Sequence, residues 1–319
     1  MKKILCVLMS CLLFVMAGCS GHSKNLKFGA ADIGGVYYSF ASTFTQLADK
    51  EIDGYTFETK TTAGSVANLR LISDGYIDLA IAQADLLSDA YNATGTFADK
   101  KYQNGYKAVA SLYTECCQIV VRKDSGITGI DDLINKTVSV GASESGSEKN
   151  AEQILKMSGI TDELINKVNM DYTEAAEKLK AGEIDAFFCT AGTRTEVIGQ
   201  LSKECDICLI SLDDKCIDKM LSAYSLCEKY TIPAGTYNGQ DSDVTTIGVK
   251  AVLIAKQSLS DDVIKNVTKT IYEHADDFKY ATSLDISFDI NTAADGVDIP
   301  FHSGAAAYYT ERGINVLTE

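Results

Sequence analysis

The alternation of apolar and polar positions predicts units in which a strand, a turn and a helix follow one another. An apolar stretch that ends at Phe28 leads into the glycine-rich turn "GAADIGG". Phe40, Phe44 and Leu47 follow the turn at helical spacing. The same order returns after "KTVSVG", where the helically spaced apolar positions are Ala151, Ile154 and Leu155. The pattern therefore indicates an α/β fold with at least two such units.

Two segments of the chain repeat each other. The pattern apolar-Gly-Ala-small-acid-x-Gly-small occurs at 28–35 and again at 140–147, which is 112 positions later. A second pattern, Gly-x-Ile-Asp, occurs at 75–78 and at 182–185, which is 107 positions later. Solenoid repeats are shorter, at roughly 20–50 residues, so a two-member repeat of this length predicts two similar α/β lobes.

Apolar stretches in the middle of the chain predict the connections between these lobes. "AVASLYTE" with "CQIVVRKDSGI" predicts a strand that crosses from the first lobe to the second, and "TTIGVKAVLIAK" predicts a strand that returns. Val263, Val267 and Ile271 predict a helix, and "FHSGAAAYYTERG" predicts a capped helix at the end. We expect the first lobe at 26–115, the second at 116–225, and the completion of the first lobe with C-terminal hinge helices at 226–319.

Both repeated turns end where a helix begins, and this position favours a ligand. The first N–H groups of a helix lack intrahelical partners, and the helix dipole places partial positive charge there. Two such helix starts that face each other would form a binding cleft for a group with negative charge. A dinucleotide site is disfavoured because "GAADIGG" lacks the G-x-G-x-x-G order, and no phosphate-loop Lys-Ser/Thr is present.

The first residues have the layout of an export signal. Two lysines precede an apolar run and small residues, which lead to Cys19. Met16-Ala17-Gly18-Cys19 resembles a bacterial lipobox, with Met16 where an aliphatic residue such as Leu is usual. We expect a signal peptide at 1–18 and a lipidated tether at 19–25. The mature protein would then be anchored by acyl chains to the extracytoplasmic face of a cell membrane.

Composition narrows the classes of partner and chemistry. The net charge is −15, and it becomes −17 without Lys2 and Lys3, which disfavours nucleic acid and anionic lipid surfaces. Seven cysteines follow Cys19, and their single CxxC has no nearby histidine, so buried free thiols are favoured over a zinc site. The three histidines show no arrangement with a nucleophile. We expect no metal, no cofactor and no catalytic residue.

Eight motifs resemble the TAXI family, the extracytoplasmic solute receptors of TRAP transporters. They occur in the family's order over nearly the whole mature chain: "IGGVYY", "TTAGSVANLRLI", "AIAQADL", "VASLYTE", "VRKDSGI", "VSVGASESGSEKNAEQIL", "IPAGTYNGQDSDVTTIGVKAVL" and "PFHSGAAAYY". The resemblance implies an α/β, two-lobed periplasmic-binding-protein fold that is type II-like, with hinge strands and a ligand cleft between the lobes. It also implies delivery of a small solute, of the glutamate, glutamine or C4–C5 dicarboxylate type, to ion-coupled TRAP permease subunits in the membrane.

The resemblance also implies which segments line the cleft. The candidates in the first lobe are Gly34, Gly35, Tyr38, Ser65, Asn68, Gln83, Asp85 and Tyr113. The candidates in the second lobe are Ser145, Gly146, Ser147, Asn150, Thr190, Ala191 and Gly192. A structural explanation fits some of them equally well, since Ser65 and Ser147 suit N-caps, Asn68 suits a turn brace, and the neighbouring Tyr37 suits a core position.

Three residues depart from the family's pattern. Asp32 and Glu144 stand where glycine is common, and each is either a solvated charge at a helix start or a partner for a ligand's amino group. Arg194 stands where proline is common, and as a bidentate donor it is the one cationic candidate for a ligand carboxylate.

Other functions share this fold. An ABC-type substrate-binding lipoprotein differs only in its transporter, and a ligand sensor would have the same sequence features. An exported enzyme would need a poised base or nucleophile, for which the sequence shows no signature.

Overall fold

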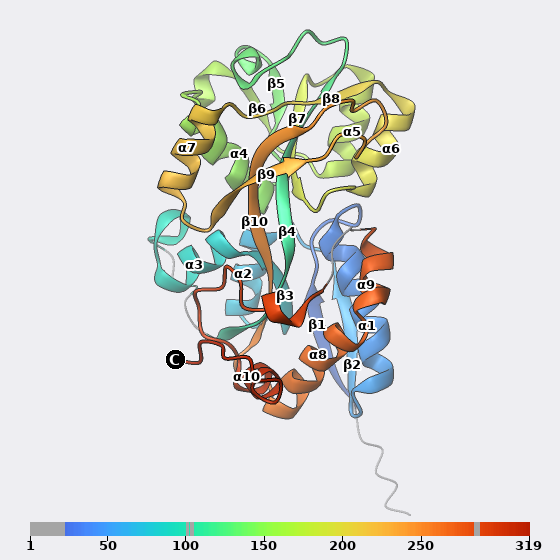
Figure 1. Ribbon diagram of the computed structural model, residues 1–319, viewed down its shortest axis with the longest axis vertical. Helices are drawn as coiled ribbons and strands as arrows, with labels where there is room; N and C mark the ends of the chain where they lie inside the picture. Colours follow the sequence, from blue (N-terminus) through green and yellow to red (C-terminus); the bar gives the residue numbers. More distant parts are fainter. Residues whose placement is uncertain (1–22, 100–101, 103–104, 284–287) are drawn as a thin grey trace, which may run out of the picture.

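The computed structural model has two lobes stacked along its long axis (Figure 1). It describes residues 23–99, 102, 105–283 and 288–319, so the predicted signal peptide at 1–18 and the predicted lipidation site Cys19 lie outside the described residues. Two long strands, β4 (Tyr106–Arg122) and β10 (Val244–Lys256), run side by side through both lobes. The predicted crossing strands are therefore confirmed. No helix in the described part of the chain is long and apolar enough to cross a bilayer.

One mixed sheet passes through the whole molecule in the order β2-β1-β3-β10-β4-β7-β5-β6. In addition, β8 pairs with β4, and β9 pairs with β10. The remaining strands of the lower lobe are β1 (Lys24–Gly29), β2 (Tyr55–Lys60) and β3 (Leu79–Gln83). The remaining strands of the upper lobe are β5 (Thr137–Ser139), β6 (Asn166–Val168), β7 (Ala186–Ala191), β8 (Ile207–Leu209) and β9 (Cys227–Ile232).

Helices cover this sheet in both lobes (Figure 1). Those of the lower, first lobe are α1 (Val36–Glu51), α2 (Ser65–Ser73), α3 (Ala84–Asn92), α8 (Asp261–Glu273), α9 (Ala275–Thr282) and α10 (Ser303–Thr310). Those of the upper, second lobe are α4 (Gly146–Met157), α5 (Tyr172–Ala181), α6 (Glu196–Glu204) and α7 (Asp214–Ala223). Short 3₁₀ turns lie at Gly95–Phe97, Ile130–Leu133, Asp162–Leu164 and Ile290–Thr292.

The predicted repeat is confirmed by the sheet. In the first lobe β1 pairs in parallel with β2 and β3, and in the second lobe β5 pairs in parallel with β6 and β7. The repeated aspartates also have the same role. Asp78 accepts a hydrogen bond from the Lys27 N–H at 2.9 Å, and Asp185 accepts one from the Thr137 N–H at 2.8 Å. Each aspartate thus ties the start of the third strand of its lobe to the first strand.

Aromatic packing fixes α1 on the sheet of the first lobe. Phe40 and Phe44 are fully buried, as their helical spacing predicts. Phe44 meets Phe28 of β1 edge to face, with ring centroids 5.5 Å apart, and Phe40 stacks on Phe278 of α9 at 4.5 Å. Because these rings fill the space behind β1, the turn that follows β1 is held at the boundary with the second lobe.

The segment around β9 differs from the predicted boundary at residue 226. β9 pairs with the first half of β10, and Lys229 forms an ion pair with Asp214 of α7 at 3.1 Å. Farther on, the Tyr237 hydroxyl donates to Gln118 and accepts from the Thr195 N–H. These residues lie beside the second lobe rather than the first, because β9 pairs with the first half of β10, which lies in the second lobe.

Candidate functional site

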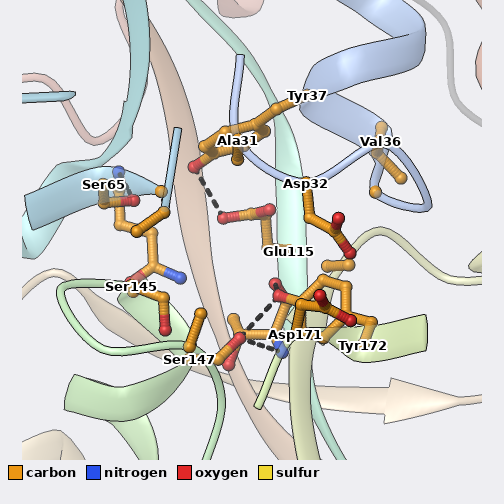
Figure 2. Close-up of a pocket in the computed structure, with 18 residues that line it drawn as sticks. Ala31, Asp32, Val36, Tyr37, Ser65, Glu115, Ser145, Ser147, Asp171 and Tyr172 are labelled. Carbon is orange, nitrogen blue, oxygen red and sulfur yellow. Dashed lines mark hydrogen bonds between the residues drawn. The ribbon is translucent and has the colours of Figure 1, made fainter. Parts of the chain in front are cut away.

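A cavity of about 40 Å³ lies between the two lobes, where the parallel strands of both end (Figure 2). Its walls come from the repeated turns, from the first residues of four helices, and from β3, β4 and β7. The lining residues are Ala31, Asp32, Gly35, Val36, Tyr37, Ala63, Gly64, Ser65, Gln83, Glu115, Ala142, Ser145, Gly146, Ser147, Asp171, Tyr172, Thr190 and Ala191.

Four helix starts converge on this cavity. Gly35, Gly64, Ser145 and Asp171 are the N-caps of α1, α2, α4 and α5. The internal repeat relates α1 to α4 and α2 to α5, so each lobe contributes one equivalent pair. Each start adds N–H groups that have no partner within the helix and a partial positive charge. The cavity can therefore hold a group that accepts hydrogen bonds.

Gly64 allows the lobes to approach closely. Its φ of 127° lies in the region that favours glycine, and a Cβ at this position would lie 3.3 Å from the Cα of Ser145 in the other lobe. A larger residue would hold the lobes apart at the cavity wall.

Glu115 is the most deeply buried acid of the cavity. It lies on β4 where this strand passes between the lobes, and only 3% of its surface is exposed. The Tyr37 hydroxyl donates to its Oε2 at 2.9 Å (Figure 2). Burial raises the pKa of the Glu115 carboxyl to about 8, although hydrogen bonds from Tyr37 and Gln83 oppose the shift. At neutral pH the protonated form of Glu115 is therefore favoured.

Two further carboxylates lie nearer the solvent. Asp32 is half-buried in the turn before α1, and its Oδ1 accepts from the Ile33 N–H at 2.8 Å, whereas its Oδ2 has no hydrogen-bond partner. Burial raises the pKa of Asp32, and the nearby charge of Asp171 adds to the effect. Asp171 is exposed at the rim and caps α5 by accepting from the Glu174 N–H.

Hydroxyl groups organise the wall of the second lobe. The Tyr172 hydroxyl donates to the Thr190 carbonyl at 2.9 Å and lies 2.6 Å from the Ser147 Oγ. The Thr190 N–H donates to the same Ser147 Oγ at 2.8 Å (Figure 2). This network fixes the start of α4 relative to β7.

Direct contacts across the boundary show that the lobes are closed. Arg70 of α2 donates to Glu144 in the turn before α4, with Nε to Oε1 at 3.1 Å and Nη2 to Oε2 at 2.7 Å. The Ala67 N–H donates to the Glu144 carbonyl at 3.1 Å. The start of α2 is therefore partly capped by the opposite lobe.

A family model described as the NMT1-like family matches residues 28–313. The chain belongs to the NMT1-like family. The match includes both lobes and every lining residue of the cavity.

Solved structures similar to this NMT1-like chain are two-lobed periplasmic binding proteins. PhnD1 from Prochlorococcus marinus, solved in complex with methylphosphonate, has a TM-score of 0.58 at 12% identity, over 83% of this chain and 93% of that one. A putative L-cystine ABC transporter protein from Listeria monocytogenes has a TM-score of 0.52 at 14% identity, over 82% and 94%. An ancestral arginine-binding protein bound to arginine has a TM-score of 0.50 at 16% identity, over 82% and 98%. These similarities confirm the predicted fold.

The NMT1-like chain brings about half of the predicted site residues to the cavity. Those that line it are Gly35, Ser65, Gln83, Ser145, Gly146, Ser147, Thr190 and Ala191, together with the specificity candidate Asp32. Those that do not line it are Gly34, Tyr38, Asn68, Asp85, Tyr113, Asn150, Gly192, Arg194 and Glu144.

Two of the residues outside the cavity, Asn68 and Glu144, have identifiable structural roles. Asn68 braces the sheet by donating to the carbonyls of Gly29 and Ile81. Glu144 pairs with Arg70, and Arg194 is exposed on the surface. The structure therefore gives Arg194 no place among the cavity residues, because the turn before α6 directs it away.

Ser65 differs from its predicted N-cap role. The N-cap of α2 is Gly64, and Ser65 is the first helical residue. Its Oγ accepts from the Gln83 N–H at 3.2 Å, so it joins α2 to the end of β3.

Sequence reasoning missed the residues that give the cavity its charge and shape. Tyr37, Glu115, Asp171 and Tyr172 line it without having been predicted as site residues. A carboxylate within the apolar pattern of "VASLYTE" was a signal for Glu115, because a buried acid in a strand needs a local partner.

The cysteines show no shared site. The seven described cysteines are free, and five of them are buried. No group of three His, Cys, Asp or Glu in the described parts of the chain is arranged to hold a metal ion.

Proposed function

We propose that this NMT1-like protein is an extracytoplasmic solute receptor that captures a small organic solute between its lobes and delivers it to a membrane transporter. The observation that carries the proposal is the polar cavity between two lobes that are joined by the continuous strands β4 and β10. Solute binding would favour the closed arrangement, which the transporter would then recognise. The protein changes no bond in this process.

The contacts across the boundary support this mechanism. The Arg70–Glu144 pair and the hydrogen bond from Ala67 to Glu144 join the lobes only when they are closed. Exposed ion pairs contribute little, typically under about 1 kcal/mol, so these contacts hold the closed form weakly. The solute would then supply most of the free energy that keeps the lobes together.

The class of transporter is a further part of the proposal. The motif resemblance to TAXI receptors supports ion-coupled TRAP permease subunits. The structural similarities support the alternative, an ABC transporter, better, since one similar protein is named as part of such a transporter. Copurification of the protein with its membrane component would distinguish the two, because only an ABC transporter contains an ATPase subunit.

We also propose a membrane-anchored location, which the N-terminal sequence supports. Cleavage after residue 18 and lipidation of Cys19 would place the lobes on the extracytoplasmic face, joined to the membrane by acyl chains. Mass spectrometry of the protein recovered from cell membranes would detect the acylated Cys19. An intact N-terminus in the mature protein would contradict this part.

The experiment that tests the receptor function identifies the natural solute. Small molecules would be extracted from the protein after purification from its own cells, identified by mass spectrometry, and added back to solute-free protein. We expect one of them to raise the melting temperature and to make the protein more compact in X-ray scattering. A protein that carries no solute and shows no change in compactness with any extracted fraction would contradict the receptor function.

A further inference from the structure

The charges of the cavity are unbalanced. Three carboxylates line it, Asp32, Glu115 and Asp171, and no lysine or arginine is among the lining residues. Arg70 is close in sequence to the cavity residue Ser65, but its guanidinium already pairs with both oxygens of Glu144. The described part of the chain therefore provides no cation within the cavity for its acids.

A buried amide adds an independent sign of a missing donor. Gln83 lines the cavity with 1% of its surface exposed, and its Oε1 has no hydrogen-bond partner. Buried polar atoms are nearly always hydrogen-bonded, and leaving one unpaired costs about 1–3 kcal/mol. The Asp32 Oδ2 is likewise buried without a partner. Both atoms accept hydrogen bonds, so a solute that donates hydrogen bonds would satisfy them.

The geometry of these acceptors points to a compact organic cation. We propose that the cavity selects a small solute with a primary ammonium group and at most one carboxylate, with the ammonium near Glu115 and Gln83. This assignment rests on the proposed receptor function and specifies its solute class. A primary ammonium offers three N–H donors, and its positive charge would stabilise the ionised form of Glu115, which burial otherwise disfavours.

The remaining features of the cavity limit the solute further. A cavity needs roughly 10–15 Å³ to hold one water molecule. A cavity of about 40 Å³ therefore suits a solute of few heavy atoms. A carboxylate on the solute would meet the starts of α2 and α4, where Ser65, Ser145 and Gly146 lie. A dicarboxylate would add a second negative charge to a cavity that already has three acids. The C4–C5 dicarboxylates implied by the resemblance fit these charges less well than small amino acids or amines.

A matched set of three-carbon compounds separates the contributions of the two charged groups. Calorimetric titrations of the purified protein at neutral pH would use propylamine, alanine and propionate, with succinate and tetramethylammonium as further probes. We expect alanine or propylamine to bind, and propionate and succinate to show no binding. Calcium chloride tests the alternative that the acids hold a metal ion.

Substitutions of the cavity acids test whether these residues bind the ammonium group. Glu115→Gln keeps the shape of the side chain and should weaken ammonium binding by about tenfold or more, because hydrogen bonds to charged groups are the stronger ones. Glu174→Gln removes an exposed carboxylate in the first turn of α5, outside the cavity, and is the matched control. Asp32→Asn provides a second, half-buried test site, and circular dichroism verifies that each variant is folded.

The possible results separate this assignment from the receptor function. Stronger binding of propionate or succinate, of tetramethylammonium alone, or of calcium would overturn the ammonium assignment. Equal affinities in the Glu115→Gln and Glu174→Gln proteins would overturn it as well, as would the absence of binding by both alanine and propylamine. If the extracted natural solute binds between the lobes but has no ammonium group, the receptor function stands and only the solute class is wrong.

Discussion

Glu115→Gln should change how the stability of the solute-free protein depends on pH. The pKa of Glu115 is about 8 in the folded protein and near 4.5 in an unfolded chain. The folded state therefore keeps a proton between these pKa values that the unfolded state has released, and stability falls as pH rises through this interval. Above about pH 8 the folded protein also releases the proton, and the loss stops growing.

The size of the effect follows from the two pKa values. One pKa unit corresponds to about 1.4 kcal/mol, so between about pH 6.5 and pH 8 Glu115 alone should lower the free energy of unfolding by about 1.5 kcal/mol. This value is an upper limit. If the lobes open, Glu115 is exposed to water and can ionise there, so the loss of stability cannot exceed the free energy of opening the lobes. Tyr37, Gln83 and Asp85 face the carboxyl from α1, β3 and α3, and Asp85, with a pKa raised by burial to about 6, titrates mainly below this interval.

Urea unfolding followed by circular dichroism measures this change, since the chain contains no tryptophan for fluorescence. Relative to wild type, Glu115→Gln should gain about 1.5 kcal/mol of stability between pH 6.5 and pH 8, whereas the exposed control Glu174→Gln should gain none. Comparison with wild type removes the contribution of other groups such as His274, whose pKa is also raised. A constant difference across the interval would refute the reasoning.

Three further predictions address closure and the thiols. A double-mutant cycle of Arg70→Ala and Glu144→Ala should give a coupling energy of about 0.5–1 kcal/mol in solute affinity, because the ion pair is bidentate but partly exposed. Purely additive effects of the two substitutions would contradict a role of this pair in closure. Gly146→Ala places a Cβ 2.5 Å from the Gln83 side chain of the other lobe, and this overlap should push the lobes apart. X-ray scattering should therefore detect a more open protein. The double variant Gly146→Ala/Gln83→Ala should be as closed as wild type. Cys205 and Cys208 are partly exposed and should react first with a thiol reagent, as mass spectrometry would show, while the five buried cysteines should need denaturant.

The architecture could be predicted because its signals are local. The repeated turns and the Gly-x-Ile-Asp pattern give each lobe the same strand order, and Asp78 and Asp185 have the same contacts. The apolar stretches of β4 and β10 were long enough to indicate strands shared by both lobes. Each of these features depends on neighbours in sequence or on an internal copy.

The charge of the cavity could not be predicted because it arises from tertiary placement. Glu115 becomes a wall of the cavity only because β4 passes between the lobes at that residue. Glu144 finds its partner in Arg70, 74 residues earlier, which no sequence pattern indicates. Arg194 had the right chemistry for a carboxylate, but the turn before α6 leaves it exposed.

The position of β10 in the sheet has a consequence for biosynthesis. β10 lies between β3 and β4 in the sheet, yet it is translated after both and after every element of the second lobe from β5 to β9. The sheet of the first lobe therefore cannot be completed until residue 256 has left the ribosome, because this lobe is built from two pieces of chain that the second lobe separates. The first lobe of such a nascent chain stays incomplete for most of its synthesis, which would suit the export that the N-terminal sequence predicts.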